Sequence, residues 1–232
     1  MLDSDRIPVS DEQLRAARRG YYGAMSLVDD HVGAILGALP GNTVVVVTSD
    51  HGDMLGERGL WYKMAPFEPS IRVPLLVHAP ERLRPRRIAH PVSLLDLGST
   101  LVELSEGAEP AIFSAERDVP LEYLAEGVRS PQVVLVRGSR KLVRTLGEPD
   151  LVYDVADDPG ERAPLEDGAL SAAADDRWDL EALGRRVRSS QERRRLVADA
   201  LSTGTITQWD IPGGYISTGD DFWTTIERAR RA

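Results

Sequence analysis

Residues 43–53, TVVVVTSDHGD, decide the fold of this chain. Four consecutive valines occupy positions 44–47, and an unbroken β-branched run predicts a strand buried on both faces, as in the parallel sheet of an α/β fold. The run ends in polar residues, and open α/β sheets bind ligands at the carboxyl ends of their strands. The stretch therefore predicts an α/β architecture with a candidate site that begins at Asp50.

The segment before this strand predicts a long helix. Ser10 has the position of an N-cap, and Gln13 can complete a capping box with it. Apolar residues then recur every three or four positions as far as Leu39, where Pro40 and the following Gly and Asn end the pattern.

Two further elements are expected after the strand. Residues 73–78 predict a second buried strand. Residues 91–104 predict a helix that turns Leu95, Leu101 and Leu104 inward.

The second half of the chain follows a different pattern. Short candidate strands separated by turn residues predict an antiparallel meander, and a helix over residues 170–202 is expected to cover it. The candidate strands span residues 119–124, 133–137, 141–146 and 151–154. We therefore expect an α/β part over residues 1–118, a small α+β subdomain with antiparallel strands and a long helix over 119–204, and a tail over 205–232.

Composition narrows the functional classes. The chain has 232 residues and a formal net charge of -9, which argues against a nucleic-acid surface because such surfaces carry basic excess. Cysteine is absent, which excludes disulfides and thiolate metal sites. No apolar run is long enough to span a bilayer, so we expect no membrane partner and a cytoplasmic protein.

Asp50 and His51 are the first candidate functional residues. A carboxylate and an imidazole at the end of a strand can point into one cleft and bind a divalent cation. The alternative is a turn in which Asp50 bonds backbone amides while His51 is merely packed. The tripeptide alone does not decide between these interpretations.

The stretch over residues 48–80 resembles the sulfatase branch of the alkaline-phosphatase superfamily. Within it, MLGERGLWYKM at residues 54–64 is especially similar to choline-sulfatases. The helical segment YYGAMSLVDDHVG at residues 21–33 resembles the helix that these enzymes place before this strand. The stretch over residues 178–201, followed by Trp209 and Asp210, resembles an extension peculiar to choline-sulfatases. The resemblance covers residues 11–210 and implies a partial alkaline-phosphatase/sulfatase-like sheet with helices.

The resemblance implies roles for individual residues. Asp50 and His51 match two ligands of a divalent cation, with calcium expected first and magnesium or manganese as alternatives. Lys63, acting with His51 in catalysis, matches the residue whose ammonium contacts the sulfate. Asp53 is expected to orient the turn, and Arg58 is expected to pair with Glu57 inside the loop.

A choline-specific enzyme must also hold a quaternary ammonium group, which calls for aromatic faces and carboxylates. Glu122 and Tyr123 offer both and match the family's segment at this place, so we predict that they bind substrate. The alternative for Glu122 is an ordinary strand residue paired with an arginine.

The family's nucleophile has no counterpart in this sequence. Sulfatases use a formylglycine made from the first residue of a C/S-x-P-x-R motif, which is absent here. The resemblance implies a parent reaction that converts choline sulfate and water to choline and sulfate. We expect this chain to need a missing N-terminal half of the catalytic domain, to be inactive alone, and to form homo-oligomers. A phosphonate or phosphate monoester hydrolase of the same superfamily and a non-catalytic oligomerisation module remain the alternatives.

Overall fold

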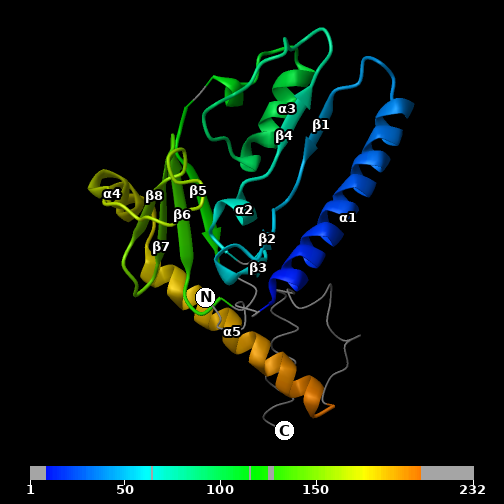
Figure 1. Cartoon of the computed structure of the whole chain (residues 1–232). Helices are drawn as coiled ribbons and strands as arrows, with labels where there is room; N and C mark the ends of the chain where they lie inside the picture. Colours follow the sequence, from blue (N-terminus) through cyan, green and yellow to red (C-terminus); the bar gives the residue numbers. More distant parts are fainter. Residues whose placement is uncertain (1–8, 64, 115, 125–127, 205–232) are drawn as a thin grey trace.

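The computed structural model describes residues 9–63, 65–114, 116–124 and 128–204, without the side chain of Leu201. Residues 205–232, which include Trp209 and Asp210, lie outside the described residues. The longest element is α1 (Asp11–Ala38), which stands at one side of the molecule (Figure 1). Its capping box is confirmed: Gln13 N donates to Ser10 Oγ at 3.2 Å, and Ser10 N donates to Gln13 Oε1 at 2.8 Å.

The valine-rich strand β1 (Val45–Thr48) pairs antiparallel with β4 (Leu75–His78). The predicted parallel pairing is therefore wrong, and so is burial on both faces. Among the described residues these two strands form a two-stranded sheet, in which β1 is mostly half-buried and Leu76 of β4 is 61% exposed. A β-branched run favours a strand, but it does not fix the direction or the number of the strand's partners.

The chain between β1 and β4 contains short elements only. They are β2 (Met54–Leu55), the 3-10 turn η2 (Glu57–Gly59), β3 (Trp61–Tyr62) and α2 (Glu68–Ile71). Strands β2 and β3 pair antiparallel, and Met54 opposes Tyr62. This loop region carries the candidate site.

The helix predicted over residues 91–104 begins later than expected. The Ser93 side chain accepts a hydrogen bond from Leu95 N and starts a 3-10 turn, η3 (Leu94–Asp96), which leads into α3 (Leu97–Ser105). Leu104 is buried as predicted, whereas Leu95 is 83% exposed and Leu101 is also exposed. The inward assignment of Leu95 and Leu101 was wrong, because Leu95 lies in the 3-10 turn before α3 and the buried side of α3 carries Thr100 and Leu104.

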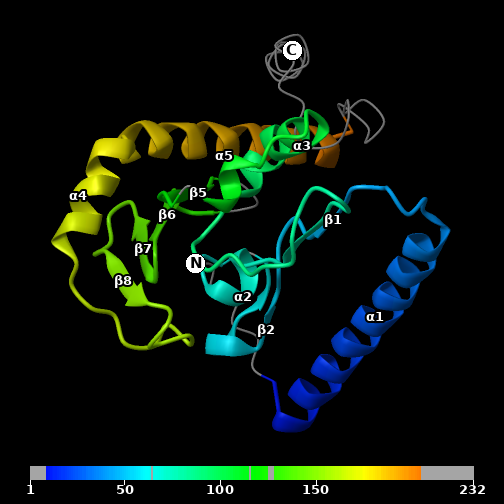
Figure 2. The ribbon, with the colours of Figure 1, turned by 90° about the horizontal axis from the view of Figure 1, so that it is seen from above.

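The antiparallel meander is confirmed. Its strands are β5 (Val119–Tyr123), β6 (Gln132–Arg137), β7 (Arg140–Thr145) and β8 (Leu151–Asp154), paired in this order. Before it lies the 3-10 turn η4 (Ala111–Phe113). The single helix expected over residues 170–202 is two helices, α4 (Gly168–Arg177) and α5 (Leu180–Ser202), which run along one side of the meander (Figure 2). The break follows from Asp179, whose side chain accepts from Ala182 N at 2.9 Å and starts a new helix.

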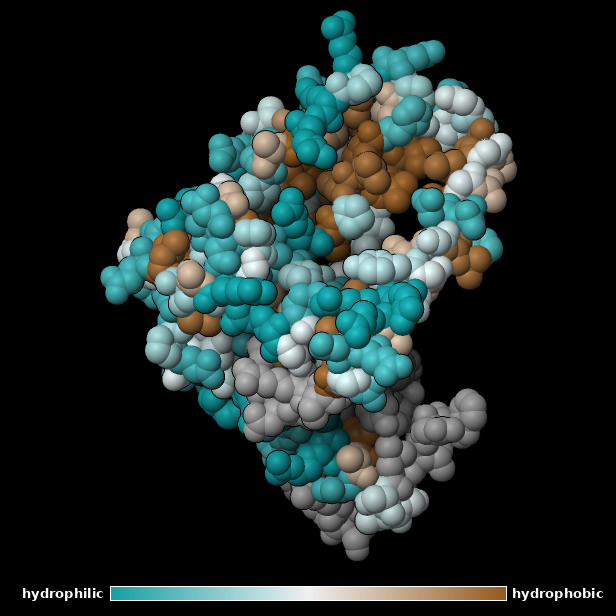
Figure 3. All heavy atoms as spheres, in the orientation of Figure 1, coloured by the Kyte–Doolittle hydropathy of each residue, from teal (hydrophilic) through white to brown (hydrophobic). Residues whose placement is uncertain are grey.

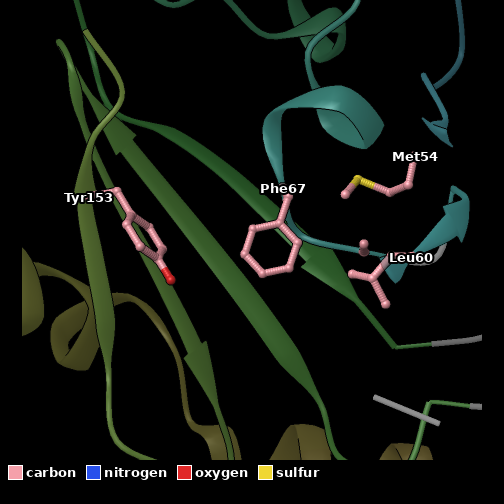
Figure 4. Close-up of a cluster of buried hydrophobic side chains, with 5 residues drawn as sticks. Met54, Leu60, Phe67 and Tyr153 are labelled. Atoms are coloured by element: carbon pink, nitrogen blue, oxygen red, sulfur yellow. The ribbon is translucent and has the colours of Figure 1, made fainter. Parts of the chain in front are cut away.

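The meander packs through both faces. On one face Leu142 and Val152 form an apolar cluster with Leu170 and Ala174 of α4. On the other face Tyr153 of β8 points toward Phe67 and the loop that carries Met54 and Leu60 (Figure 4). The loop with the candidate site is thus held against the outer face of the meander. No helix in the described part of the chain is long and apolar enough to cross a membrane.

Candidate functional site

Asp50 and His51 lie directly after β1 and contact each other. His51 N donates to Asp50 Oδ1 at 3.0 Å, and His51 Nε2 lies 3.5 Å from Asp50 Oδ2. Desolvation opposes the shift, yet the backbone hydrogen bond from His51 and the nearby imidazole lower the pKa of Asp50 below its ordinary value. The carboxylate is therefore ionised at neutral pH, and its side chain is 84% exposed.

The ring of His51 is oriented by the backbone. Its Nδ1 lies 2.9 Å from the carbonyl oxygen of Gly52, so the tautomer that donates from Nδ1 leaves the Nε2 lone pair available. The 3.5 Å between Nε2 and Asp50 Oδ2 is compatible with a shared cation, since bonds from metal ions to protein nitrogen and oxygen are about 2.0–2.6 Å long. Within the described residues no cluster of three or more metal-ligating side chains occurs, so this pair supplies two donors only. The turn alternative shares the same geometry, because Asp50 does bond a backbone amide.

Gly52 brings the turn into contact with α2. Gly52 N donates to Ser70 O at 2.7 Å, and a Cβ atom at Gly52 would lie 2.1 Å from Pro69 O. Only glycine fits this approach, so the glycine after the histidine has a steric reason.

Ser70 links the turn to Lys63. The Ser70 side chain is buried, and its hydroxyl donates to Lys63 O while its own carbonyl accepts from Gly52 N. In addition, Met54 opposes Tyr62 across the β2–β3 pair, and Asp53 and Lys63 are the next residues along the chain from these two. The backbones of the Asp50–His51 turn and of Lys63 thus meet at one buried serine. That the Lys63 ammonium points toward Asp50 and His51 stays a prediction.

Backbone strain lies beside Lys63. Tyr62 has a φ of 66°, in the left-handed region that bulky residues rarely adopt. Such conformations persist where the surrounding structure enforces them, and they are concentrated at functional sites.

Asp53 contacts α1. Tyr21 OH donates to Asp53 Oδ2 at 3.2 Å, and burial together with this carboxylate raises the pKa of Tyr21. The expected Glu57–Arg58 pair is wrong: Glu57 pairs with Arg18 of α1 at 3.0 Å, whereas Arg58 lies over the ring of Phe67. The loop is therefore held by contacts from outside it.

Glu122 and Tyr123 are consecutive in β5 and point to opposite faces of the meander. Glu122 accepts from Trp178 Nε1 at 2.9 Å, so its partner is a tryptophan and not the arginine of the alternative. Tyr123 lies on the other face, which is shared with Tyr153 and meets the loop. The structure therefore does not bring Glu122 and Tyr123 to one place.

Sequence reasoning missed Ser70 as well as Lys141 and Glu161, which contact α2 from the meander side. A serine directly after a proline carries no distinctive pattern. The one available signal was that Lys141 falls within a predicted strand, next to Leu142 and Val143.

The fold is shared with solved structures of sulfatase-type enzymes. The chain aligns with a 2-O GAG sulfatase with a TM-score of 0.52 and 23% identity, over 76% of this chain and 40% of that chain. It aligns with the phosphonate monoester hydrolase of Agrobacterium radiobacter with a TM-score of 0.56 and 26% identity, over 74% of this chain and 41% of that chain. The chain therefore has the alkaline-phosphatase-like fold of hydrolases, as the sequence predicts.

Sequence comparison gives the family. Residues 3–108 match the family described as Sulfatase, and residues 185–212 match the one described as Choline sulfatase enzyme C terminal. The choline-sulfatase of Rhizobium meliloti (strain 1021) is 36% identical over 90% of this chain and 46% of its own length. Arylsulfatase K of Xenopus laevis is 34% identical over 49% of this chain and 22% of its own length. The chain belongs to the sulfatase family and spans less than half the length of these two relatives.

Proposed function

We propose that this chain carries one part of the active site of a sulfuric ester hydrolase whose substrate is choline sulfate. The observation that carries the proposal is Ser70, which fastens the Asp50–His51 turn and the Lys63 loop to each other. Membership of the sulfatase family supports hydrolysis of a sulfate ester, and the 36% identity to a choline-sulfatase supports this particular ester.

In this proposal Asp50 and His51 hold a divalent cation, calcium first and magnesium or manganese as alternatives. Such an ion would act as a Lewis acid toward an ester oxygen. Lys63 places a compact positive charge on a sulfate oxygen, where negative charge grows as the ester bond breaks. The formylglycine nucleophile has no counterpart in this chain, so we propose that another segment supplies it.

We further propose that this segment is the N-terminal half of a sulfatase catalytic domain. An exposed apolar surface supports this: Figure 3 shows hydrophobic residues gathered where α1 faces the region of α3, β1 and β4. Helix α1 has no buried residue, although its apolar positions recur at helical spacing. Large exposed apolar side chains in these elements are Tyr22, Met25, Leu27, Val28, Ile35, Leu36, Leu76, Leu101 and Val102. Patches of this kind mark sites of protein association.

The test pairs this chain with the N-terminal half of the Rhizobium choline-sulfatase, matured to formylglycine in the expression host. We expect a stable complex that hydrolyses choline sulfate and binds calcium more tightly than either half. Lys63→Ala should lower turnover by about 10²–10³-fold without dissociating the complex. Leu76→Glu, on the apolar surface, should instead weaken assembly. An assembled complex in which Lys63→Ala keeps full activity would refute the proposed role of Lys63.

A phosphonate monoester hydrolase is the second candidate, because the Agrobacterium enzyme is 26% identical in sequence and similar in structure. The same complex assayed on phenyl phosphonates separates the two, since a preference for the phosphonate would reject choline sulfate as the substrate. For the choline group we propose either Tyr123 or Glu122, because the two lie on opposite faces of the meander and cannot both line one site. Tyr123→Ala and Glu122→Gln, tested separately, should raise KM for choline sulfate, and an unchanged KM would remove the residue concerned from the substrate site.

Homo-oligomer formation is also proposed. The proposal follows the family resemblance at the C-terminal end, where residues 185–212 match the choline-sulfatase C-terminal family and overlap most of α5. Light scattering on the assembled complex gives the stoichiometry directly, and a complex with one copy of this chain would exclude the homo-oligomer.

A further inference from the structure

A buried charged cluster joins the meander to the candidate site. Lys141 of β7 is 0% exposed, and its Nζ lies 2.5 Å from Glu161 Oε1 and 3.2 Å from Glu68 Oε1. Glu161 is 1% exposed and accepts from Glu68 N through Oε2 at 2.7 Å. Arg58 Nη1 donates to Glu161 O at 2.5 Å. Three charged side chains and one guanidinium contact are thus concentrated at the start of α2.

Such a cluster is a poor source of stability. Removing charges from water costs several kcal/mol per ion, and replacing a buried ion pair with apolar residues of similar volume is often neutral or stabilising. The chain could have continued the apolar packing of Tyr153 and Phe67, which lies beside the cluster. The retained charges therefore call for an explanation other than stability.

The backbone around the cluster is strained. Among the described residues four that are not glycine have a positive φ, and Arg58, Tyr62 and Glu161 are three of them. Arg58 and Glu161 belong to the cluster, and Tyr62 precedes Lys63. Strain of this kind is retained where a position must be enforced.

The path from the cluster to the site is short. Glu68 is the first residue of α2, and the cluster holds both its amide and its carboxylate. Two residues later, Ser70 bonds Gly52 N and Lys63 O. A shift of α2 therefore moves the Asp50–His51 turn and Lys63 together.

The two lysines of the sequence also connect the charged cluster with the candidate site. The sequence contains 28 lysine and arginine residues, of which Lys63 and Lys141 alone are lysines. Arginine is thus used at nearly every basic position. The two exceptions are the candidate sulfate contact and the residue whose ammonium fits between two buried carboxylates.

We propose that Lys141 and Glu161 are positioning residues that set the site through α2. The inference builds on the proposed function only in treating the Asp50–His51 turn and Lys63 as one site. Lys141 and Glu161 touch neither the turn nor Lys63 in any contact described above; they act on Glu68, and α2 transmits their position.

The test uses the full chain and two readouts that require no sulfatase activity. Hydrogen exchange followed by mass spectrometry reports peptides covering residues 51–54 and 66–73, and amine acylation reports Lys63. In Lys141→Met, we expect exchange in these peptides to become faster by roughly tenfold, because a buried carboxylate loses its partner. The acylation rate of Lys63, then the sole lysine, should change as well.

A matched control lies on the same strand. Arg144 also forms a charged cluster, with Asp150 and Asp175, but on the face that carries α4. Arg144→Met should speed exchange in residues 168–177 and leave the site peptides and Lys63 acylation unchanged. A merely structural role for Lys141 predicts the same response in both variants.

The near-isosteric Glu161→Gln covers the case in which Lys141→Met does not fold, because the amide oxygen can still accept from Glu68 N. It should shift the same peptides and the same lysine by a smaller factor. Unchanged site peptides in Glu161→Gln, or equal effects of Lys141→Met and Arg144→Met on Lys63, would overturn the proposal. Hydrogen exchange and lysine acylation do not depend on hydrolysis of choline sulfate by the assembled enzyme. A failure of the proposed function can therefore be told apart from a failure of this inference.

Discussion

Replacing Gly52 with alanine should break the contact between the Asp50–His51 turn and α2. The added Cβ would lie 2.1 Å from Pro69 O, 3.2 Å from Pro69 C and 3.5 Å from Ser70 O. All three are backbone atoms, so no side-chain rotation can relieve the clash. The φ of Gly52 lies outside the left-handed region, and the cost therefore comes from contact alone.

The expected cost has two parts. Overpacking at a rigid position costs about 1–3 kcal/mol. Moving the turn at Gly52 away from α2 also lengthens or breaks the 2.7 Å hydrogen bond from Gly52 N to Ser70 O, which contributes about 1 kcal/mol. Together they predict a loss of about 2–4 kcal/mol in the free energy of unfolding.

Urea unfolding at one fixed protein concentration measures this loss, because association would otherwise shift the midpoint. Gly33→Ala is the matched control: it lies in α1 with nothing within 4 Å of the added Cβ, and it should raise stability by about 0.5–1 kcal/mol. If Gly52→Ala unfolds at the same urea concentration as the parent chain, the close approach to Pro69 does not constrain the turn.

Three further results are expected. Native amine acylation should modify Lys63 and spare Lys141, which is fully buried, whereas labelling of both at equal rates would contradict the buried cluster. Arg144 lowers the pKa of Asp150 through a hydrogen bond and its charge, although desolvation opposes the shift. The ionised Asp150 carboxylate therefore stabilises the folded chain above about pH 3.8, and this stabilisation is lost as the pH falls through the lowered pKa of Asp150 in the folded state. Urea midpoints measured from pH 6 to pH 2 should fall in that acid range less steeply in Asp150→Asn than in the parent, and parallel curves would exclude this carboxylate. Without a partner half, the chain should elute as an oligomer or aggregate in gel filtration, and Leu76→Glu should increase the monomer fraction; a monodisperse parent monomer would refute the exposed-surface argument.

Features governed by local chemistry could be predicted from the sequence. The capping box at Ser10 depends on residues three apart, and it forms as expected. The meander turns depend on Gly138 and Gly147, whose φ values of 57° and 85° few other residues adopt. The break between α4 and α5 was also local, but the capping capacity of Asp179 was hidden inside a helical pattern.

Features governed by tertiary contact could not be predicted. The β-branched run predicted β1, but nothing within it specified the antiparallel partner β4, about 30 residues later. Glu57 and Arg58 are adjacent with opposite charges, but each finds a partner elsewhere in the fold. The residues that hold the candidate site in place also depend on tertiary contact, since Glu161 contacts α2 across 93 positions of sequence.

The two faces of the meander explain how one small sheet can serve stability and placement at once. Toward α4, Leu142 and Val152 bury apolar surface, and this non-directional packing tolerates small shifts of the helix. Toward the loop, Lys141 adds directional contacts whose energy falls quickly when donor and acceptor move apart. Apolar packing alone would hold α2 near the meander without fixing where Ser70 lies. Substitution of Lys141 should therefore disturb the geometry of the site, whereas substitution of Leu142 or Val152 should mainly lower the stability of the fold.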